Sequence, residues 1–136
     1  ICRLVIKNKF LNGLILTNTT IQRDSLFKKP VKNSWKLGEE GGLSGVPLRE
    51  KTNKIIRSAY ELTNGKITII GVGGISTGKD AFEKISMGAS LLQLYTSLIY
   101  QGPNVVVRIL SDLSCSLKRK GLKNVSDLIG KNIQYD

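Results

Sequence analysis

Residues 67–72, ITIIGV, form a short run whose side chains are apolar on both faces of an extended chain. Such a run is typical of a strand in a parallel sheet that is covered by helices. Two more short apolar runs occur, at residues 12–17 (NGLILT) and 90–95 (SLLQLY). Because segments with helical periodicity follow these runs, we expect an α/β fold with parallel strands.

Two helices are expected between the runs. One covers residues 48–64 and stops at Gly65. Thr77 can cap the other, with Asp80 three residues later as in a capping box, and Gly88 marks its end. The side chains expected on the buried faces are Ile55, Ile56, Ala59 and Leu62 in the first helix, and Ala81, Phe82 and Ile85 in the second.

Three helical segments are expected after the last run. Residues 96–101 allow one short helical turn, Pro103 opens a longer helix and Gly121 ends it. Asn124 and Asp127 can cap a last short helix. The stripe expected to be buried on the longer helix is Val106, Ile109, Leu110, Leu113 and Leu117.

The number of strands limits what these units can build. A complete (β/α)₈ barrel takes about 250 residues. This chain has 136, begins at Ile1 and has Met87 as its only methionine, so we expect it to be part of a longer protein. We therefore expect residues 1–136 to be the C-terminal three or so βα units of a TIM barrel, within a single domain.

Gly73 and Gly74 follow the second run, where the strand is expected to end. Glycine lets backbone N–H groups approach a ligand, and the next helix directs its N-terminal N–H groups toward the same space. Tyr95 and Thr96 end the third run and open a short helix. Loops of this kind form the phosphate site of many (β/α)₈ barrels, so we predict a phosphate here. The alternative is that the glycine pair only makes a tight turn.

Polar side chains follow the first run, at residues 16–20 (LTNTT). Asn18 offers an amide and Thr19 a hydroxyl at the end of a strand, where barrel active sites lie. These groups suit a planar, polar ligand. The alternatives are an Asx or ST turn, and N-glycosylation, which we discount because the sequence gives no sign of secretion. A long polar loop is expected at residues 22–42, and residues 41–45 (GGLSG) add glycines and one hydroxyl.

Lys and Arg number 21 against 10 Asp and Glu, a net charge of +11. This balance permits nucleic acid or anionic lipid as a partner. The basic residues do not alternate with aromatic residues that could stack on bases. We expect both local clusters to be solvated surface: Lys28, Lys29, Lys32 and Lys36, and Lys118, Arg119, Lys120 and Lys123.

The chain has no histidine and only two cysteines, Cys2 and Cys115. The absence of histidine excludes Ser–His and Cys–His catalytic pairs, and two distant cysteines do not make a usual zinc site. We expect no metal site, and two reduced, mostly buried thiols.

The motifs TNTT (17–20), GGLSG-x-PLR (41–49) and IIGVGGIS to QLYT (69–96) together resemble the C-terminal part of class 2 dihydroorotate dehydrogenase. That family is quinone-linked, uses FMN, and belongs to pyrimidine synthesis. The resemblance runs from about residue 12 to residue 130. It implies an enzyme of UMP biosynthesis that oxidises dihydroorotate to orotate through FMN, at the mitochondrial inner membrane.

The resemblance also implies roles for single residues. Asn18 and Thr19 would bind dihydroorotate or orotate. The residues that would bind FMN are Thr17, Ser44, Gly45, Gly73, Gly74, Leu94, Tyr95 and Thr96.

The chain departs from the family in what precedes these motifs. The family's catalytic base is a serine on an upstream loop, and nothing here matches that loop. Its N-terminal helical pair, which lines the ubiquinone path and touches the membrane, has no counterpart either. We therefore expect no catalytic residue in the chain and no activity from it alone. The alternatives are another FMN- or phosphate-binding barrel enzyme and a basic module for nucleic acid or lipid; among partners, we expect no nucleic acid.

Overall fold

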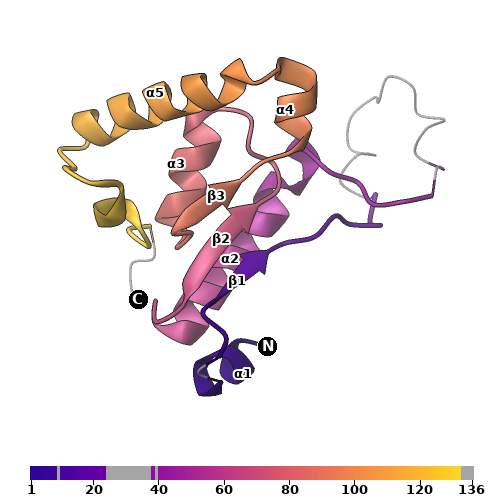
Figure 1. Ribbon diagram of the computed structural model, residues 1–136, viewed down its shortest axis with the longest axis vertical. Helices are drawn as coiled ribbons and strands as arrows, with labels where there is room; N and C mark the ends of the chain where they lie inside the picture. Colours follow the sequence, from indigo (N-terminus) through magenta and orange to yellow (C-terminus); the bar gives the residue numbers. More distant parts are fainter. Residues whose placement is uncertain (9, 24–37, 39, 133–136) are drawn as a thin grey trace.

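The chain alternates between strands and helices over residues 1–8, 10–23, 38 and 40–132, which this computed structural model describes. Three strands run side by side at its centre (Figure 1). Most of the predicted loop at residues 22–42 lies outside the described residues. The elements are α1 (Cys2–Lys7), β1 (Gly13–Leu16), η3 (Val46–Leu48), α2 (Arg49–Thr63), β2 (Thr68–Val72), α3 (Gly78–Ser86), β3 (Leu91–Gln93), α4 (Thr96–Gln101), α5 (Asn104–Arg119) and η4 (Val125–Leu128).

The strands form one parallel sheet in the order β1-β2-β3. Helix α2 lies in the crossover from β1 to β2, helix α3 in the crossover from β2 to β3, and α4 and α5 follow β3. Strand–helix units of this kind are the repeat of a (β/α)₈ barrel. The predicted α/β fold of about three βα units is confirmed. Helix α1 is an element that the sequence pattern did not predict.

Within the described residues, helices pack against one face of the sheet. Ile69 of β2 is fully buried and packs against Ile56 of α2. Because side chains alternate along a strand, Ile70 points to the other face. Its register partners there, Ile15 and Leu91, are 61% and 57% exposed. We expected helices to cover the sheet, and they cover only the face that would be the outside of a barrel.

Helix α3 begins as predicted. The side chain of Thr77 accepts a hydrogen bond from the backbone N–H of Asp80 at 3.2 Å, and the Asp80 carboxylate accepts one from the N–H of Thr77 at 2.9 Å. On the predicted buried face, Ala81 and Ile85 are buried and Phe82 is partly buried. The capping box and the apolar stripe together fix both the start and the rotation of this helix.

The buried face of α5 differs from the predicted stripe. Val105 is fully buried, whereas the predicted Val106 and Leu110 are 41% and 60% exposed. Ile109 and Leu113 are buried as predicted. The buried positions therefore follow one another at intervals of four residues. Consecutive valines at the start of the helix allow either face, and only contact with α3 decides between them.

The buried face of α2 also includes polar positions. Ile56 and Ala59 are buried as predicted, but Ile55 and Leu62 are 38% and 69% exposed. Thr52 is fully buried instead. The exposed pair lies beside the short α1 and β1, with which it lines a shallow pocket.

An isolated antiparallel bridge joins Thr20 to Leu43. The N–H of Thr20 donates to the Leu43 carbonyl at 3.2 Å, and the N–H of Leu43 donates to the Thr20 carbonyl at 2.8 Å. The Arg23 guanidinium donates to the carbonyls of Thr20 and Gly41 at 2.9 and 2.8 Å. These bonds hold the segment after β1 beside the glycine-rich loop, although the two are far apart in the sequence.

Both cysteines are free, as predicted, but they are not buried: Cys2 is partly buried and Cys115 is exposed. The basic residues at 118–120 and 123 are exposed, as predicted for solvated surface, and the other basic cluster lies outside the described residues. No helix in the described part of the chain is long and apolar enough to cross a bilayer.

Candidate functional site

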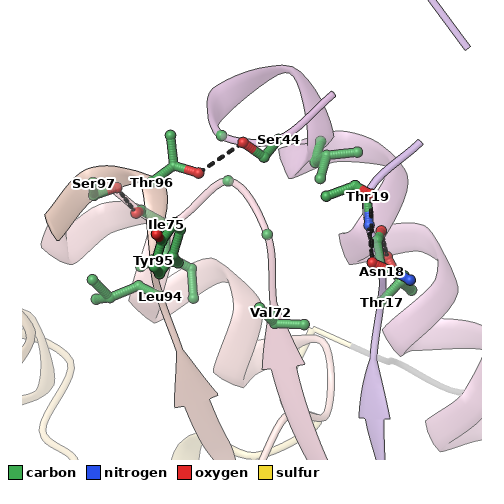
Figure 2. Close-up of a pocket in the computed structure, with 14 residues that line it drawn as sticks. Thr17, Asn18, Thr19, Ser44, Val72, Ile75, Leu94, Tyr95, Thr96 and Ser97 are labelled. Carbon is green, nitrogen blue, oxygen red and sulfur yellow. Dashed lines mark hydrogen bonds between the residues drawn. The ribbon is translucent and has the colours of Figure 1, made fainter. Parts of the chain in front are cut away.

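A pocket of about 170 Å³ opens at the carboxyl ends of the strands. In Figure 2 the three strands point toward it, and side chains from the loops that follow them surround its mouth. Every residue that we predicted to bind substrate or cofactor lines this one pocket: Thr17, Asn18, Thr19, Ser44, Gly45, Gly73, Gly74, Leu94, Tyr95 and Thr96.

Gly73 and Gly74 form the wall of the pocket that follows β2. Both have positive φ, 99° and 75°, which side chains rarely allow. A Cβ on Gly74 would lie 2.5 Å from the Cα of Arg49, so the loop approaches the start of α2 too closely for any side chain. The glycines therefore make a tight turn, and they also leave backbone rather than side chains facing the pocket.

The first turn of α3 does not face the pocket, contrary to our expectation. The N–H groups of Ser76 and Thr77 donate to the Asp80 carboxylate at 3.0 and 2.9 Å. Arg49 donates to the other carboxylate oxygen at 2.6 Å. Burial by itself raises the pKa of Asp80, but the hydrogen bonds from Arg49 and Ser76 outweigh it, so the pKa is below its ordinary value. The chain's own carboxylate thus occupies the helix N-terminus where we expected a phosphate.

The loop after β3 closes the pocket on the opposite wall. The Thr96 hydroxyl donates to the Ser44 hydroxyl at 2.9 Å, which joins α4 to the glycine-rich loop (Figure 2). The Ser97 hydroxyl donates to the Ile75 carbonyl, which joins α4 to the loop after β2. Tyr95 is 73% exposed at the mouth. The hydroxyls of Ser44 and Thr96 and the backbone turn at residues 73–74 therefore surround the same pocket.

Asn18 and Thr19 lie on the third wall, after β1, and both are exposed. The Asn18 side-chain oxygen accepts a hydrogen bond from the Thr19 N–H at 2.8 Å and lies 3.4 Å from the Thr19 hydroxyl. The Thr17 hydroxyl donates to the Asn18 carbonyl at 3.2 Å. All three contacts are between neighbours in the sequence. They are therefore not the Asx turn that we named as an alternative, which spans two residues; an ST turn forms just after them, where the Thr20 hydroxyl accepts from the Gln22 N–H at 3.2 Å. The Asn18 NH₂ makes no hydrogen bond within the described residues.

The polar groups of the pocket are neutral. Its lining, within the described residues, contains hydroxyls, one side-chain amide and backbone groups, but no charged side chain. The backbone N–H of Gly74 makes no hydrogen bond within the described part of the chain. Backbone N–H groups and hydroxyls are donors that suit a phosphate without a counter-charge. The described residues contain no cluster of ligands that could hold a metal ion.

Sequence reasoning missed four residues of the lining: Leu48, Val72, Ile75 and Ser97. Val72 and Ile75 flank the glycine pair, and Ser97 follows Thr96, so their places in the sequence could have indicated them. Leu48 gave no such signal, because only folding brings the start of α2 under the loop after β2.

Comparisons with known proteins agree on one family. The family model described as dihydroorotate dehydrogenase matches residues 1–117. The mouse protein "Dihydroorotate dehydrogenase (quinone), mitochondrial" is 49% identical over 120 residues, which cover 88% of this chain and 29% of the mouse protein. "Dihydroorotate dehydrogenase (quinone)" of Trichodesmium erythraeum is 45% identical over 128 residues, which cover 93% of this chain and 34% of that protein.

Solved structures agree as well. The crystal structure of a ligand-free DHODH from Eimeria tenella matches with a TM-score of 0.87 and 41% identity, covering 98% of this chain and 36% of that one. A complex of the Eimeria tenella DHODH with ferulenol matches with a TM-score of 0.88 and 42% identity, covering 99% of this chain and 34% of that one. The chain therefore spans about a third of the length of the relatives that it matches.

Proposed function

Because this chain belongs to the dihydroorotate dehydrogenase family, we propose that it forms part of a quinone-dependent enzyme that oxidises dihydroorotate to orotate with FMN, in pyrimidine synthesis. The chain contributes the wall of the site that holds the cofactor phosphate and one edge of the substrate. The remaining parts of the active site, and the quinone path, lie outside its described residues.

The observation that carries this proposal is the convergence of separate stretches on one pocket. Residues 17–19, 44–45, 73–74 and 94–96 are far apart in the sequence, and all of them line the same cavity. The sequence alone predicted a ligand-binding role for each stretch, from its place after a strand or from its resemblance to a flavin- or substrate-binding motif. A chance resemblance would not place all of these stretches around one space at the carboxyl ends of the strands.

The residues present fit the phosphate of FMN. Gly73 and Gly74 leave the backbone bare, and the unpaired N–H of Gly74 supplies a donor within the described chain. The hydroxyls of Ser44 and Thr96, 2.9 Å apart, can each turn toward a phosphate oxygen. The pocket volume of about 170 Å³ is smaller than a drug-sized site, roughly 300–1,000 Å³, and suits one end of the cofactor rather than the whole of it.

On the substrate side, Asn18 and Thr19 supply a donor-and-acceptor amide and a hydroxyl for the ring and carboxylate of dihydroorotate. Bound FMN supplies the hydride acceptor of the reaction. The reaction also removes a proton from the substrate. The described lining holds no carboxylate, lysine or histidine that could take it at neutral pH, so we propose that the chain alone binds flavin but does not turn over.

The cellular location follows from the relatives only as a proposal. The mouse and rice proteins are named mitochondrial, whereas the Trichodesmium protein is not. We assign this chain to the mitochondrial inner membrane, with ubiquinone as the electron acceptor. A band in the membrane fraction of purified mitochondria, on an immunoblot of the source cells, is the expected result.

The direct test is binding of FMN and of riboflavin, which lacks the phosphate, measured by titrating flavin fluorescence with the purified protein. We expect FMN to bind more tightly than riboflavin. Thr96→Val should reduce that preference by about tenfold, the effect of losing a hydrogen bond to a charged group. Thr68→Val is the matched control, since Thr68 is exposed at the opposite end of β2.

Equal binding of the two flavins, or of neither, would overturn the cofactor assignment. Dihydroorotate-dependent dye reduction by this chain alone would overturn the proposal that it lacks the base. The two alternatives predict other results. Part of a different flavin enzyme would bind FMN more tightly than riboflavin but would not bind orotate. A basic module would bind nucleic acid, with an affinity that falls steeply as the salt concentration rises.

A further inference from the structure

Lys84 is the largest side chain that the described chain buries completely, with 0% exposed. It lies on α3, and its stem crosses β2 at Gly71, where a Cβ would come within 2.8 Å of the Lys84 Cδ. Burial lowers the pKa of Lys84 to about 8. A buried ammonium is costly, and none of the substrate or cofactor roles assigned above uses it.

The ammonium makes two short hydrogen bonds to α2. It donates to the hydroxyl of Thr52 and to the side-chain oxygen of Asn53, both at 2.7 Å. Lys has donors only, so Thr52 accepts and keeps its own hydrogen to donate elsewhere. That hydroxyl lies 3.2 Å from the Gly73 carbonyl and 3.1 Å from the Arg49 carbonyl. Lys84 is therefore linked to the pocket wall through one side chain.

The hydrogen bond from Thr52 constrains the orientation of the peptide between Gly73 and Gly74. Thr52 holds the Gly73 carbonyl on the side of α2. In a trans peptide the N–H points opposite to the C=O, so the N–H of Gly74 points away from Thr52. Gly74 lines the pocket, and its N–H makes no hydrogen bond within the described residues. Two successive glycines with positive φ do not fix such a peptide by themselves.

We propose that Lys84 is a positioning residue for the phosphate group of the ligand: through Thr52 it holds the Gly73–Gly74 peptide with its N–H directed at the pocket. The inference rests on the phosphate site proposed above and extends it to residues that do not touch the ligand. The same donors would bind the phosphate group of FMN or inorganic phosphate, so the test has to distinguish these two ligands.

The other charged groups near Lys84 do not replace it. Asp80 and Glu83 on the same helix favour its charged form, and Arg49 on α2 disfavours it. Asp80 is engaged with Arg49 and with the N–H groups before α3. Within the described residues, the Lys84–Thr52 bond is the one that connects this charged group with the backbone of the pocket.

The test compares variants of the purified protein for binding of FMN, riboflavin and inorganic phosphate. Thr52→Val keeps the shape and removes the hydroxyl, and Lys84→Met removes the ammonium. We expect each to weaken FMN binding by about tenfold, as for the loss of a well-oriented N–H to a charged group. We expect riboflavin binding to change by less than about twofold, because the phosphate is absent.

Two further variants separate positioning from packing. Asn53→Ala removes a hydrogen bond of the same length from Lys84 but none from Gly73, and should keep the preference for FMN. Thr52→Ser restores the hydroxyl and should rescue the preference lost in Thr52→Val. If inorganic phosphate competes with FMN in the wild type but not in Thr52→Val, the phosphate itself is the group that the network positions.

The possible outcomes distinguish the positioning role of Lys84 from the phosphate site itself. Equal losses for FMN and riboflavin in Thr52→Val, or a full preference for FMN in both Thr52→Val and Lys84→Met, would overturn the positioning role and leave the phosphate site intact. A wild type that does not distinguish FMN from riboflavin would instead overturn the proposed phosphate site, and the role of Lys84 with it.

Discussion

The walls of the pocket that follow β2 and β3 (residues 73–75 and 95–97, the glycine side) are built differently from the wall that follows β1 (residues 17–19, the amide side). Behind the glycine side, Asp80 and Lys84 are almost fully buried and bond to residues of α2. On the amide side, Asn18 and Thr19 are exposed, and within the described residues their side chains bond to their neighbours in the sequence.

This difference separates two ways of making a site. The glycine side is preorganised by contacts within the chain itself, so its shape should survive without a ligand. The amide side follows β1, an edge strand with a single neighbour within the described residues. Its side chains have room to adjust to what they bind. The same chain thus supplies a rigid anchor for one end of a ligand and an adaptable contact for the other.

Among the substitutions considered, Gly74→Ala should destabilise the glycine side of the pocket most. The new Cβ would meet the Arg49 Cα at 2.5 Å, and φ is 75°. Backbone strain and overpacking together should lower the free energy of unfolding by about 2–5 kcal/mol, measured in urea. Gly102→Ala is the control, because Gly102 has a similar φ of 72° but nothing within 4 Å of a new Cβ. It should show only the strain, about 1–2 kcal/mol. Equal losses would mean that α2 does not hold the loop.

Asp80→Asn is expected to come next. Asp80 is 1% exposed and its partner Arg49 is 38% exposed, so we expect a loss of about 2 kcal/mol at neutral pH. Since the folded state lowers the pKa of Asp80, its contribution is complete above pH 3.8 and is lost as the pH falls through the lowered pKa. Acid titrations of the unfolding free energy should therefore be steeper for the wild type than for the variant.

The control for that change is Glu61→Gln, which makes the same chemical change in an exposed ion pair with Arg57 at 2.8 Å. It should cost less than about 0.5 kcal/mol. If it costs as much as Asp80→Asn, the buried position of Asp80 has no special weight.

Lys84→Met should change how stability responds to alkali. The pKa of Lys84 is about 8 in the fold and 10.5 in the unfolded chain, so between these values the unfolded chain binds more protons. Stability from this group therefore rises with pH across that window. We expect the unfolding free energy of the wild type to rise relative to that of Lys84→Met from pH 8 to 10.5. Parallel curves would show that the fold does not lower the pKa of Lys84, which would then stay protonated across this window.

Asn18→Ala should have the smallest effect on the fold. The side chain is exposed and bonds only to Thr19 among the described residues, so we expect the unfolding free energy to change by no more than about 0.5 kcal/mol. Orotate binding, followed by equilibrium dialysis in the presence of FMN, should weaken, while FMN binding stays near the wild-type value. A loss of stability as large as that of Asp80→Asn would show that the two sides of the pocket do not differ as described.

The features predicted from the sequence are those with local signals. The apolar runs located the strands, Thr77 and Asp80 located the start of α3, and Gly73 and Gly74 located the turn at the pocket. A positive φ and a capping box each involve residues within a few positions of one another. Such signals can be found in a single sequence without knowing what packs where.

The features that could not be predicted depend on residues that only folding brings together. Asp80 was named as a helix cap, but its partner Arg49 is 31 positions away, and so the closed N-terminus of α3 was missed. In the sequence, Lys84 is not distinguished from the other basic residues of a chain with a net charge of +11. Its burial follows from its position under Gly71, which only the fold shows. The buried face of α5 was misplaced because its apolar residues satisfy two faces equally well.

The antiparallel bridge between Thr20 and Leu43 ties together the two segments that lead into the pocket. The two backbone bonds fix where the chain leaves β1 and where it re-enters the glycine-rich loop. Lengthening a flexible loop twofold costs only about 0.6 kcal/mol in closure entropy. A change in the number of residues between Thr20 and Leu43 should therefore cost little, and the two backbone bonds can still hold residues 17–19 and 44–45 in place around the pocket.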